Sequence, residues 1–216
     1  TDIEKAFLVN ADGTENLAEA CAENNAQFIH VSTDYVFDGE NNLAYTEEDF
    51  TNPLGVYGAS KLAGDELALE VNPCSVILRT SWVYSEFGKN FVKTMLNLFA
   101  TKEELSIVAD QFGQPTNAND LAEAIMKIIK SEKITPGIFN FSNLGRISWF
   151  DFAEKIAELS EAKIKLNAIE TSQYPTPAKR PKNSVLDLDK ISKTYAIQLK
   201  PWEESLEDCV QILQNN

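Results

Sequence analysis

A tyrosine and a lysine spaced by one helical turn are the residues of this chain best suited to acid–base chemistry. Tyr57 and Lys61 stand in the run YGASK at residues 57–61. If this run is helical, the phenol and the ammonium share one face, because residues four apart have Cβ atoms roughly 5–6 Å apart. A free tyrosine titrates near pKa ~10, so proton transfer near neutral pH needs a nearby cation that favours the phenolate. The pair therefore predicts a phenolic proton donor whose pKa is lowered by Lys61.

Thr33 adds a third polar group, a hydroxyl, at the end of an apolar stretch. Residues 27–33 read QFIHVST, a short apolar run of the kind that is buried on both faces of a parallel sheet. The Tyr-x-x-x-Lys spacing alone also fits an amphipathic helix with a solvated lysine. A threonine at a strand end before that helix favours the catalytic interpretation. His30, the only histidine, lies in mid-strand, where we expect a packed residue rather than a catalytic base.

The composition is that of an ordinary globular protein. The 216 residues are 44% hydrophobic, enough to bury the core of one large domain or of a domain with a subdomain. The sequence has no apolar run near ~18 residues and no basic-then-apolar leader, so it predicts a soluble cytoplasmic protein without a membrane span. Cys21, Cys74 and Cys209 are too few and too widely spaced for a disulfide framework or a zinc site.

The formal net charge of −14 argues against a nucleic-acid partner, because proteins that grip phosphate backbones carry basic faces. A small anionic substrate is still allowed, since it needs only a few local cations. The candidate cations are Lys61, Arg79, Lys179, Arg180 and Lys182. For Lys179 and Lys182 a solvated surface charge is the favoured interpretation. For Arg180 the two interpretations, a cation that binds an anionic ligand and a solvated surface charge, are favoured equally.

Strands and helices alternate along the first 135 residues. We expect helices at 10–25, 55–70, 90–100 and 119–129, and strands at 27–33, 75–80 and 105–108. Such alternation implies crossover connections and a parallel sheet. Beyond Pro136 the pattern changes, with a strand at 138–141, a helix at about 148–159 and a last helix from Glu203. These later elements predict a smaller lobe packed on the first.

Five segments, in order along the chain, carry recognisable motifs. They read STDYVFDG at 32–39, PLGVYGASKLAG at 53–64, RTSWVY at 79–84, DQFGQPT at 110–116 and YPTPAKRP at 174–181. Together they resemble the extended short-chain dehydrogenase/reductases and, within these, the dTDP-4-dehydrorhamnose reductases. The resemblance implies an α/β fold with a Rossmann-like, doubly wound parallel sheet and a smaller α/β substrate-binding lobe. We expect a dinucleotide-binding domain with the catalytic residues at 1–135 and mainly the substrate lobe at 136–216, with some exchange of chain.

The resemblance also implies a reaction. The 4-keto group of dTDP-4-dehydrorhamnose, a dTDP-linked 6-deoxysugar, is reduced to dTDP-L-rhamnose by NADPH or NADH. Tyr57 protonates the oxygen as hydride arrives, and Thr33 forms a hydrogen bond to the same oxygen. Lys61 lowers the pKa of Tyr57 and, with Tyr57, contacts the nicotinamide ribose end of the cofactor.

The resemblance assigns substrate contacts to Asp34 and Trp82, beside Thr33, and Arg180 is the candidate for the anionic part of the substrate. Asp34 could instead satisfy backbone donors in a turn, and Trp82 could belong to the core. Tyr35 either belongs to the site or packs beside it.

The chain departs from the family in its first residues. The family begins with a strand, a glycine-rich turn and a helix whose N-terminus receives the cofactor pyrophosphate. Here Gly13 lies inside a helical pattern, and Gly55, Gly58 and Gly64 have the wrong spacing. We therefore expect that the first strands of the cofactor domain are missing and that the 216-residue chain alone is inactive. Both NADPH and NADH remain candidates, because the residues that read the ribose 2′-position belong to that region.

A second departure concerns metal. Some members of the family are magnesium-bridged dimers that use carboxylates, one of them a Glu shortly after the Gln-Pro-Thr segment. Asn119 stands at that place here. An amide is a weaker ligand for a hard cation than a carboxylate, so we expect no metal site. A homodimer is left open.

Two other functions compete with the reductase. A nucleotide-sugar epimerase or dehydratase that uses NAD shares the family fold, and so does a non-catalytic regulatory subunit. A dehydratase is expected to place acidic residues directly after the strand-end threonine, whereas Asp34 is followed by Tyr35. A binding module has no need of a phenol beside a cation. The sequence therefore favours the reductase.

Overall fold

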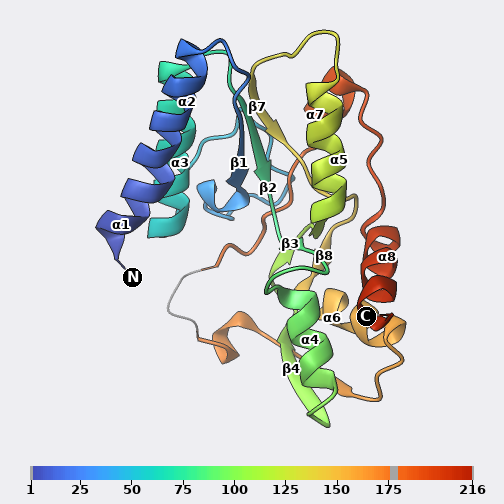
Figure 1. Cartoon of the computed structure of the whole chain (residues 1–216). Helices are drawn as coiled ribbons and strands as arrows, with labels where there is room; N and C mark the ends of the chain where they lie inside the picture. The colour runs from blue at the N-terminus through green and yellow to red at the C-terminus, as the bar shows by residue number, and fades with distance from the viewer. Residues whose placement is uncertain (1, 176–179, 216) are drawn as a thin grey trace.

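The computed structural model describes residues 2–175 and 180–215, which form a sheet region and a lower lobe (Figure 1). The sheet region comprises α1 (Ile3–Phe7), η1 (Leu8–Asp12), α2 (Gly13–Glu23), β1 (Ile29–Thr33), η2 (Asp34–Val36), α3 (Val56–Val71), β2 (Val76–Thr80), α5 (Ala118–Ile129), β7 (Gly137–Asn140) and α7 (Asp189–Tyr195). The lower lobe comprises β3 (Val83–Tyr84), α4 (Phe91–Phe99), β4 (Glu104–Val108), β5 (Phe112–Gly113), β6 (Thr116–Asn117), β8 (Ile147–Ser148), α6 (Trp149–Leu159), β9 (Lys165–Ile169), η3 (Thr171–Gln173) and α8 (Trp202–Gln214). The helices and strands that the sequence predicts are all present.

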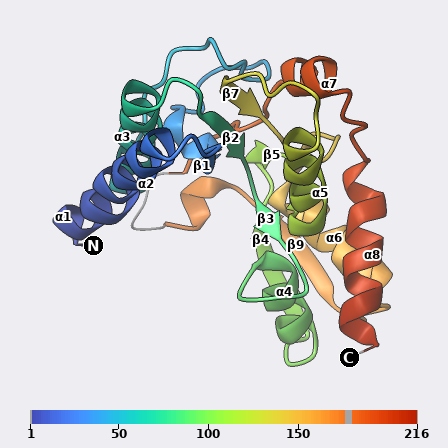
Figure 2. The same cartoon turned by 45° about the horizontal axis from the view of Figure 1, so that its top comes forward.

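Strand β2 is the centre of a three-stranded parallel sheet, with β1 on one side and β7 on the other. All five residues of β2 are buried. Val76 and Leu78 pack with the apolar side chains of α5 and α7, whereas Ile77 packs with α2 and α3. Figure 2 shows these helices on opposite sides of the sheet. Because side chains alternate between faces along a strand, a sheet covered on both faces needs a continuous apolar strand. The predicted doubly wound parallel sheet is confirmed.

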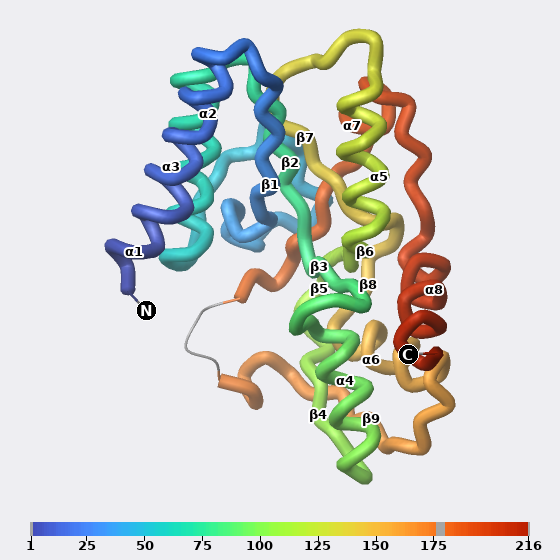
Figure 3. The backbone as a smooth tube through the Cα atoms, viewed as in Figure 1, coloured from blue at the N-terminus to red at the C-terminus, as the bar shows by residue number. Residues whose placement is uncertain are grey.

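The chain passes more than once between the sheet region and the lower lobe, as the tube in Figure 3 shows. Strand β4 pairs in parallel with β9, and helix α4 lies in the same apolar cluster as α6 and α8. The strand expected at 138–141 in the smaller lobe is instead β7 of the central sheet, because Phe139 completes the core under α5 and α7. The boundary near residue 136 stays a prediction, and the exchange of chain is extensive.

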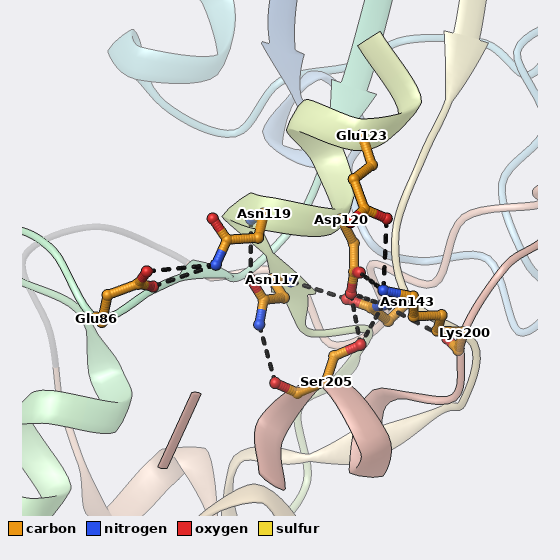
Figure 4. A network of polar contacts seen from close by, with 8 residues as sticks. All are labelled: Glu86, Asn117, Asn119, Asp120, Glu123, Asn143, Lys200 and Ser205. Atoms are coloured by element: carbon orange, nitrogen blue, oxygen red, sulfur yellow. Dashed lines mark hydrogen bonds and ion pairs between the residues drawn. The ribbon is translucent and has the colours of Figure 1, made fainter. Parts of the chain in front are cut away.

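Buried polar contacts join the sheet region to α8 (Figure 4). Asp120 of α5 accepts hydrogen bonds from the Asn143 amide at 2.7 Å and from the Ser205 hydroxyl, and it pairs with Lys200 at 2.7 Å. Asn117 caps α5 and donates to the Ser205 backbone oxygen at 2.9 Å. Paired burial of these groups avoids the cost of isolated polar atoms, so the network fixes where α8 begins relative to the sheet.

Helix α3 approaches its neighbours closely at two glycines. A Cβ on Gly58 would overlap the Tyr35 carbonyl oxygen in η2, and a Cβ on Gly64 would overlap the Asn10 carbonyl oxygen in η1. Both neighbours are backbone atoms, which cannot turn aside as a flexible side chain can. The two glycines therefore set the distance between α3 and the segments that carry Asn10 and Tyr35.

We expect Gly64→Ala to lower the free energy of unfolding by about 1–3 kcal/mol, because the added methyl overpacks a backbone contact. Urea unfolding followed by circular dichroism measures this change. Gly55→Ala is the matched control, since a Cβ at Gly55 meets nothing within 4 Å. Equal stability of the two variants would contradict the close approach of α3 to η1.

Candidate active site

The carboxyl ends of β1 and β2 and the first turns of α3 surround a pocket of about 390 Å³. In the parallel register Thr33 of β1 lies opposite Thr80 of β2, so the residues that follow both strands emerge at one edge of the sheet. Ligands of open α/β sheets bind at this edge. The pocket is lined by Asn10, Val31, Ser32, Thr33, Asp34, Tyr35, Tyr57, Lys61, Thr80, Trp82 and Val83. It brings together all the predicted site residues except Arg180.

Thr33 and Asp34 form the floor of the pocket and are both buried. The Thr33 hydroxyl accepts a hydrogen bond from the Tyr35 backbone N–H at 3.2 Å and donates to Asp34 Oδ1 at 3.1 Å. The other carboxyl oxygen, Oδ2, has no hydrogen-bond partner among the described residues. Burial raises the pKa of Asp34 to about 6, although the hydrogen bond from the Thr33 hydroxyl opposes the rise. An orphaned buried oxygen in a pocket wall is suited to accept a hydroxyl of a ligand.

Tyr57 lies on the first turn of α3 with 53% of its surface exposed, and its ring meets that of Tyr35 edge to face at 5.9 Å. Burial of part of the ring raises the pKa of Tyr57, while a hydrogen bond with Thr33 lowers it and the charges of Asp34 and Asp65 raise it further. The expectation that Lys61 lowers this pKa is wrong for the described residues. The phenol therefore keeps its proton at neutral pH.

Lys61, on the next turn of α3, turns its ammonium toward β1. Its Nζ donates to the Val31 carbonyl oxygen at 2.9 Å and lies 2.7 Å from His30 Nε2. Burial lowers the pKa of Lys61, and the charge of Asp65 opposes this shift. These contacts explain why the ammonium acts on β1 more than on Tyr57. His30, expected to be a packed residue rather than a catalytic base, contacts Lys61 of the predicted site.

A buried ion pair lies beneath Lys61. Asp65, 1% exposed, accepts a hydrogen bond from the Ser32 hydroxyl at 2.8 Å and pairs with Arg79 Nε at 3.4 Å. Arg79 is 2% exposed, and its guanidinium also lies over the Phe37 ring at 5.3 Å. Arg79, a candidate cation for an anionic substrate, is therefore committed to Asp65 and does not line the pocket.

Trp82 follows β2 with a positive φ of 47°, a conformation that a bulky residue adopts only under constraint. Its ring stacks on Trp149 at 3.5 Å with an interplanar angle of 10°. Trp149 in turn lines a second pocket of about 410 Å³, between α4 and β4. The stacked pair thus links the linings of the two pockets, since Trp82 lines the first and Trp149 the second.

Arg180 lines this second pocket together with Tyr174 and with the Phe91 and Trp149 rings. The predicted segment 174–181 is described only at Tyr174, Pro175, Arg180 and Pro181, so Lys179 lies outside the described residues. Lys182 lines a separate pocket, with Asp110 and Arg146. Of the two loop cations that the structure describes, Arg180 and not Lys182 lies near the Phe91 and Trp149 rings.

Asn10 lines the pocket and is not among the site residues predicted from the sequence. It stands in η1, a π-helical turn, and π turns inside helices often mark functional sites. Its side-chain amide donates to the Ser60 hydroxyl at 3.0 Å, and its carbonyl oxygen accepts from the Thr14 hydroxyl at 2.8 Å. The sequence signal that could have identified this site residue is a polar Asn10 directly after the apolar residues 6–9.

Asn119, which stands where a metal ligand was considered, donates its amide to both carboxylate oxygens of Glu86 at 3.4 Å (Figure 4). Across residues 2–175 and 180–215 no group of three or more His, Cys, Asp or Glu side chains could hold a metal ion. Within the same ranges no helix combines the length and apolar character that a bilayer span requires.

The donor set of the pocket fits the nicotinamide ribose end of a dinucleotide. The Lys61 ammonium has three N–H donors, of which two are used within the described chain, so one is left for a ribose hydroxyl. The half-exposed Tyr57 side chain lies four residues before Lys61 in α3 and lines the same pocket. A parallel sheet with a threonine at its carboxyl edge and Tyr-x-x-x-Lys on the next helix defines a short-chain dehydrogenase/reductase.

Comparison with known proteins specifies the family. Residues 1–215 match the family model described as RmlD substrate binding domain, and the chain belongs to this family. It is 48% identical over 210 residues to a Sinorhizobium fredii protein named dTDP-4-dehydrorhamnose reductase, covering 93% of this chain and 71% of that protein.

Solved structures of similar proteins support the same family. A dTDP-4-dehydrorhamnose reductase from Clostridium acetobutylicum is 40% identical and superposes with a TM-score of 0.93, over 98% of this chain and 75% of that one. One from Bacillus anthracis, solved in complex with NADP, is 37% identical with a TM-score of 0.93, over 98% and 74% of the two chains. The predicted family and its oxidoreductase class are confirmed.

We expect Asp34→Asn to stabilise the protein at pH 8 and to leave it nearly unchanged at pH 4. Because the pKa of Asp34 in the folded state is about 6, raised from 3.8, the folded state binds the proton more tightly. Stability is therefore lost as pH rises from about 4 through 6, by about 3 kcal/mol, and a neutral amide avoids this loss. Urea unfolding at both pH values measures it.

The matched control is Asp38→Asn. Hydrogen bonds from the Glu40 backbone and from Tyr45 lower the pKa of Asp38, so its charged form is favoured by folding and the amide should not stabilise at pH 8. A gain for Asp38→Asn as large as that for Asp34→Asn, or no gain for Asp34→Asn, would contradict the buried-carboxylate account.

Proposed function

We propose that this protein reduces the 4-keto group of dTDP-4-dehydrorhamnose to give dTDP-L-rhamnose, with NADPH or NADH as the reductant. The observation that carries the proposal is the convergence of Thr33, Tyr57 and Lys61 on one pocket at the carboxyl edge of a parallel sheet. The names of the relatives and the NADP in the Bacillus anthracis structure support the substrate and the cofactor.

The residues of the pocket divide the reaction between them. When bound, the nicotinamide cofactor supplies the hydride, which adds to C4 of the sugar while the C4–O4 double bond becomes a single bond. Tyr57 donates its phenolic proton to O4, so that ketone, hydride and proton together give the alcohol. The Thr33 hydroxyl stabilises the charge that grows on O4. Lys61 holds the ribose next to Tyr57, and the phenolate left behind is reprotonated from solvent.

The second pocket is suited to the nucleotide part of the substrate. Its Phe91 and Trp149 rings, 4.7 Å apart at their centroids, offer aromatic faces to a pyrimidine base. Arg180 at its rim provides a fork of donors for a diphosphate oxygen. In this arrangement the Trp82 and Trp149 stack separates base from sugar, and Asp34 Oδ2 accepts a sugar hydroxyl.

The wider setting of the activity follows from its substrates. A dTDP-sugar and a nicotinamide cofactor are both metabolites of the cytoplasm, and we place the protein there. We propose residues 1–135 as the dinucleotide-binding domain that carries the catalytic residues and 136–216 as mainly the substrate lobe, with the segment from β3 to β6 exchanged into that lobe. A homodimer is compatible with this arrangement, and neither nucleic acid nor a membrane has a part in it.

The decisive test is the reaction itself. The protein expressed from its complete gene should oxidise NADPH only when dTDP-4-dehydrorhamnose is present, and mass spectrometry should find the alcohol with two added hydrogens. NADPH oxidation without a reduced sugar, or isomerisation of the sugar without net NADPH use, would contradict the reductase.

Tyr57→Phe should lower kcat by about 10²–10⁴-fold, because it removes the general acid and leaves the ring in place. NADPH consumption under saturating substrate measures this loss. Tyr195→Phe is the matched control, since the Tyr195 hydroxyl binds the Thr135 carbonyl oxygen at 2.6 Å, away from the pocket. Full turnover by Tyr57→Phe would remove Tyr57 as the acid.

Arg180→Ala should raise KM for the dTDP-sugar about tenfold and leave kcat within about threefold, since a charge-assisted hydrogen bond to a diphosphate is worth roughly 1.5–3 kcal/mol. Initial rates at varied substrate give both constants. The control variant is Lys163→Ala, because Lys163 is exposed in the connection between α6 and β9. A fall in kcat alone would place Arg180 outside the diphosphate site.

A further inference from the structure

The ammonium of Lys61 contacts a side chain on β1 as well as the β1 backbone. His30 Nε2 lies 2.7 Å from Lys61 Nζ, and the Val31 carbonyl oxygen lies 2.9 Å from the same nitrogen. Because an ammonium has only donors, His30 must accept through Nε2 and carry its own proton on Nδ1. The imidazole is thus held in the Nδ1–H form.

The surroundings of His30 keep it neutral. The charged groups that face it are Lys61 and Asp65 of α3, with Arg79 of β2 paired to Asp65 behind it. Asp65 Oδ1 lies 3.8 Å from His30 Nε2, too far for a hydrogen bond, and the Phe28 ring stacks on the imidazole at 6.0 Å. Burial and the charge of Lys61 lower the pKa of His30 to about 4. The imidazole therefore stays an acceptor throughout the neutral range.

The two acceptors on β1 fix the direction of the third N–H of Lys61. Staggered donors on one nitrogen point to three different places, so occupation of two by strand atoms leaves the third for the pocket that Lys61 lines. Without His30 the ammonium would hold a single anchor, the Val31 carbonyl, and would rotate about it. The long side chain would then regain rotamer freedom that ligand binding must remove.

We propose that His30 is a positioning residue, whose neutral imidazole accepts one N–H of Lys61 and thereby aims the remaining N–H at a ligand hydroxyl in the Tyr57 pocket. The ligand side of this role rests on the proposed reductase function, whereas the His30–Lys61 contact does not. His30 touches no reacting atom and transfers no proton.

The sole histidine of the chain gives a direct spectroscopic test. Nitrogen-15 NMR of uniformly labelled protein at pH 7 should show one imidazole in the Nδ1–H form, with an unprotonated Nε2 that accepts a hydrogen bond. Free imidazole favours the Nε2–H form, so the two outcomes are distinct. The Nε2–H form would overturn the proposal.

A titration of the same signal tests the ammonium. The imidazole should not titrate between about pH 5.5 and 8, whereas an unperturbed histidine has pKa ≈ 6.5. Lys61→Met should raise the histidine pKa and shift the Nε2 signal. The matched control Lys163→Met, at an exposed lysine far from β1, should change neither. An identical histidine signal in Lys61→Met and wild type would overturn the contact.

Two substitutions at His30 separate positioning from packing. His30→Gln keeps an acceptor oxygen near the place of Nε2, whereas His30→Leu fills the space without an acceptor. In the protein expressed from its complete gene, His30→Leu should raise KM for NADPH about tenfold, and His30→Gln should stay within about threefold of wild type. Thermal unfolding of both variants checks that they fold equally well.

Equal loss in His30→Gln and His30→Leu would show a packing role and overturn the proposal. If the wild-type protein reduces no dTDP-4-dehydrorhamnose, the proposed function fails. The tautomer and the Lys61→Met titration still decide the His30–Lys61 contact in that case, since neither measurement needs turnover.

Discussion

The parallel pairing of β1 with β2 is the constraint on which the site depends. Because Thr33 lies opposite Thr80, the chain leaves both strands at the same edge of the sheet, toward Asp34 on one side and Trp82 on the other. Helix α3 brings Tyr57 and Lys61 to this edge only because Gly58 and Gly64 permit backbone contact with η2 and η1. A one-residue slip of β1 would turn Thr33 away from the pocket, since side chains alternate along a strand.

The same arrangement places charge where solvent cannot reach it. Asp65 and Arg79 form a buried pair under Lys61, and such pairs add little net stability because desolvation offsets the attraction. Burial of Asp34 is compensated even less than that of this pair, because its Oδ2 has no hydrogen-bond partner among the described residues. These groups are better explained by the pocket above them than by folding. They hold donors and acceptors in fixed directions at some expense of stability, as functional sites commonly do.

The local elements could be predicted from the sequence, and the contacts between distant residues could not. Apolar periodicity identifies α3, α5 and β2, because it reflects the face that each buries. Strand β9 was missed, since its mixed run KLNAI gains its partner β4 only from 61 positions earlier in the chain. The same limit applies to the residues of the site, whose long-range contacts could not be predicted. Tyr57 and Lys61 stand four apart and are readable as a pair, whereas the contacts of Lys61 with His30 and of Arg79 with Asp65 depend on how α3 lies on the sheet.

The direction of the pKa shift of Tyr57 bears on which protonation state of the phenol is present in the pocket. A tyrosine that abstracts a proton from an alcohol near neutral pH needs a lowered pKa. In the structure burial raises the pKa of Tyr57, a hydrogen bond with Thr33 opposes the rise, and the charges of Asp34 and Asp65 add to it, while Lys61 is turned toward β1. A phenol that retains its proton at neutral pH suits the opposite task, which is to protonate an oxygen that becomes an alkoxide. An alkoxide is a far stronger base than a phenolate, so that transfer stays favourable even from a phenol with a raised pKa. The electrostatics of the pocket therefore keep the phenol in the protonated form that a general acid needs, and they bear on the pH dependence of the reaction rather than on its direction.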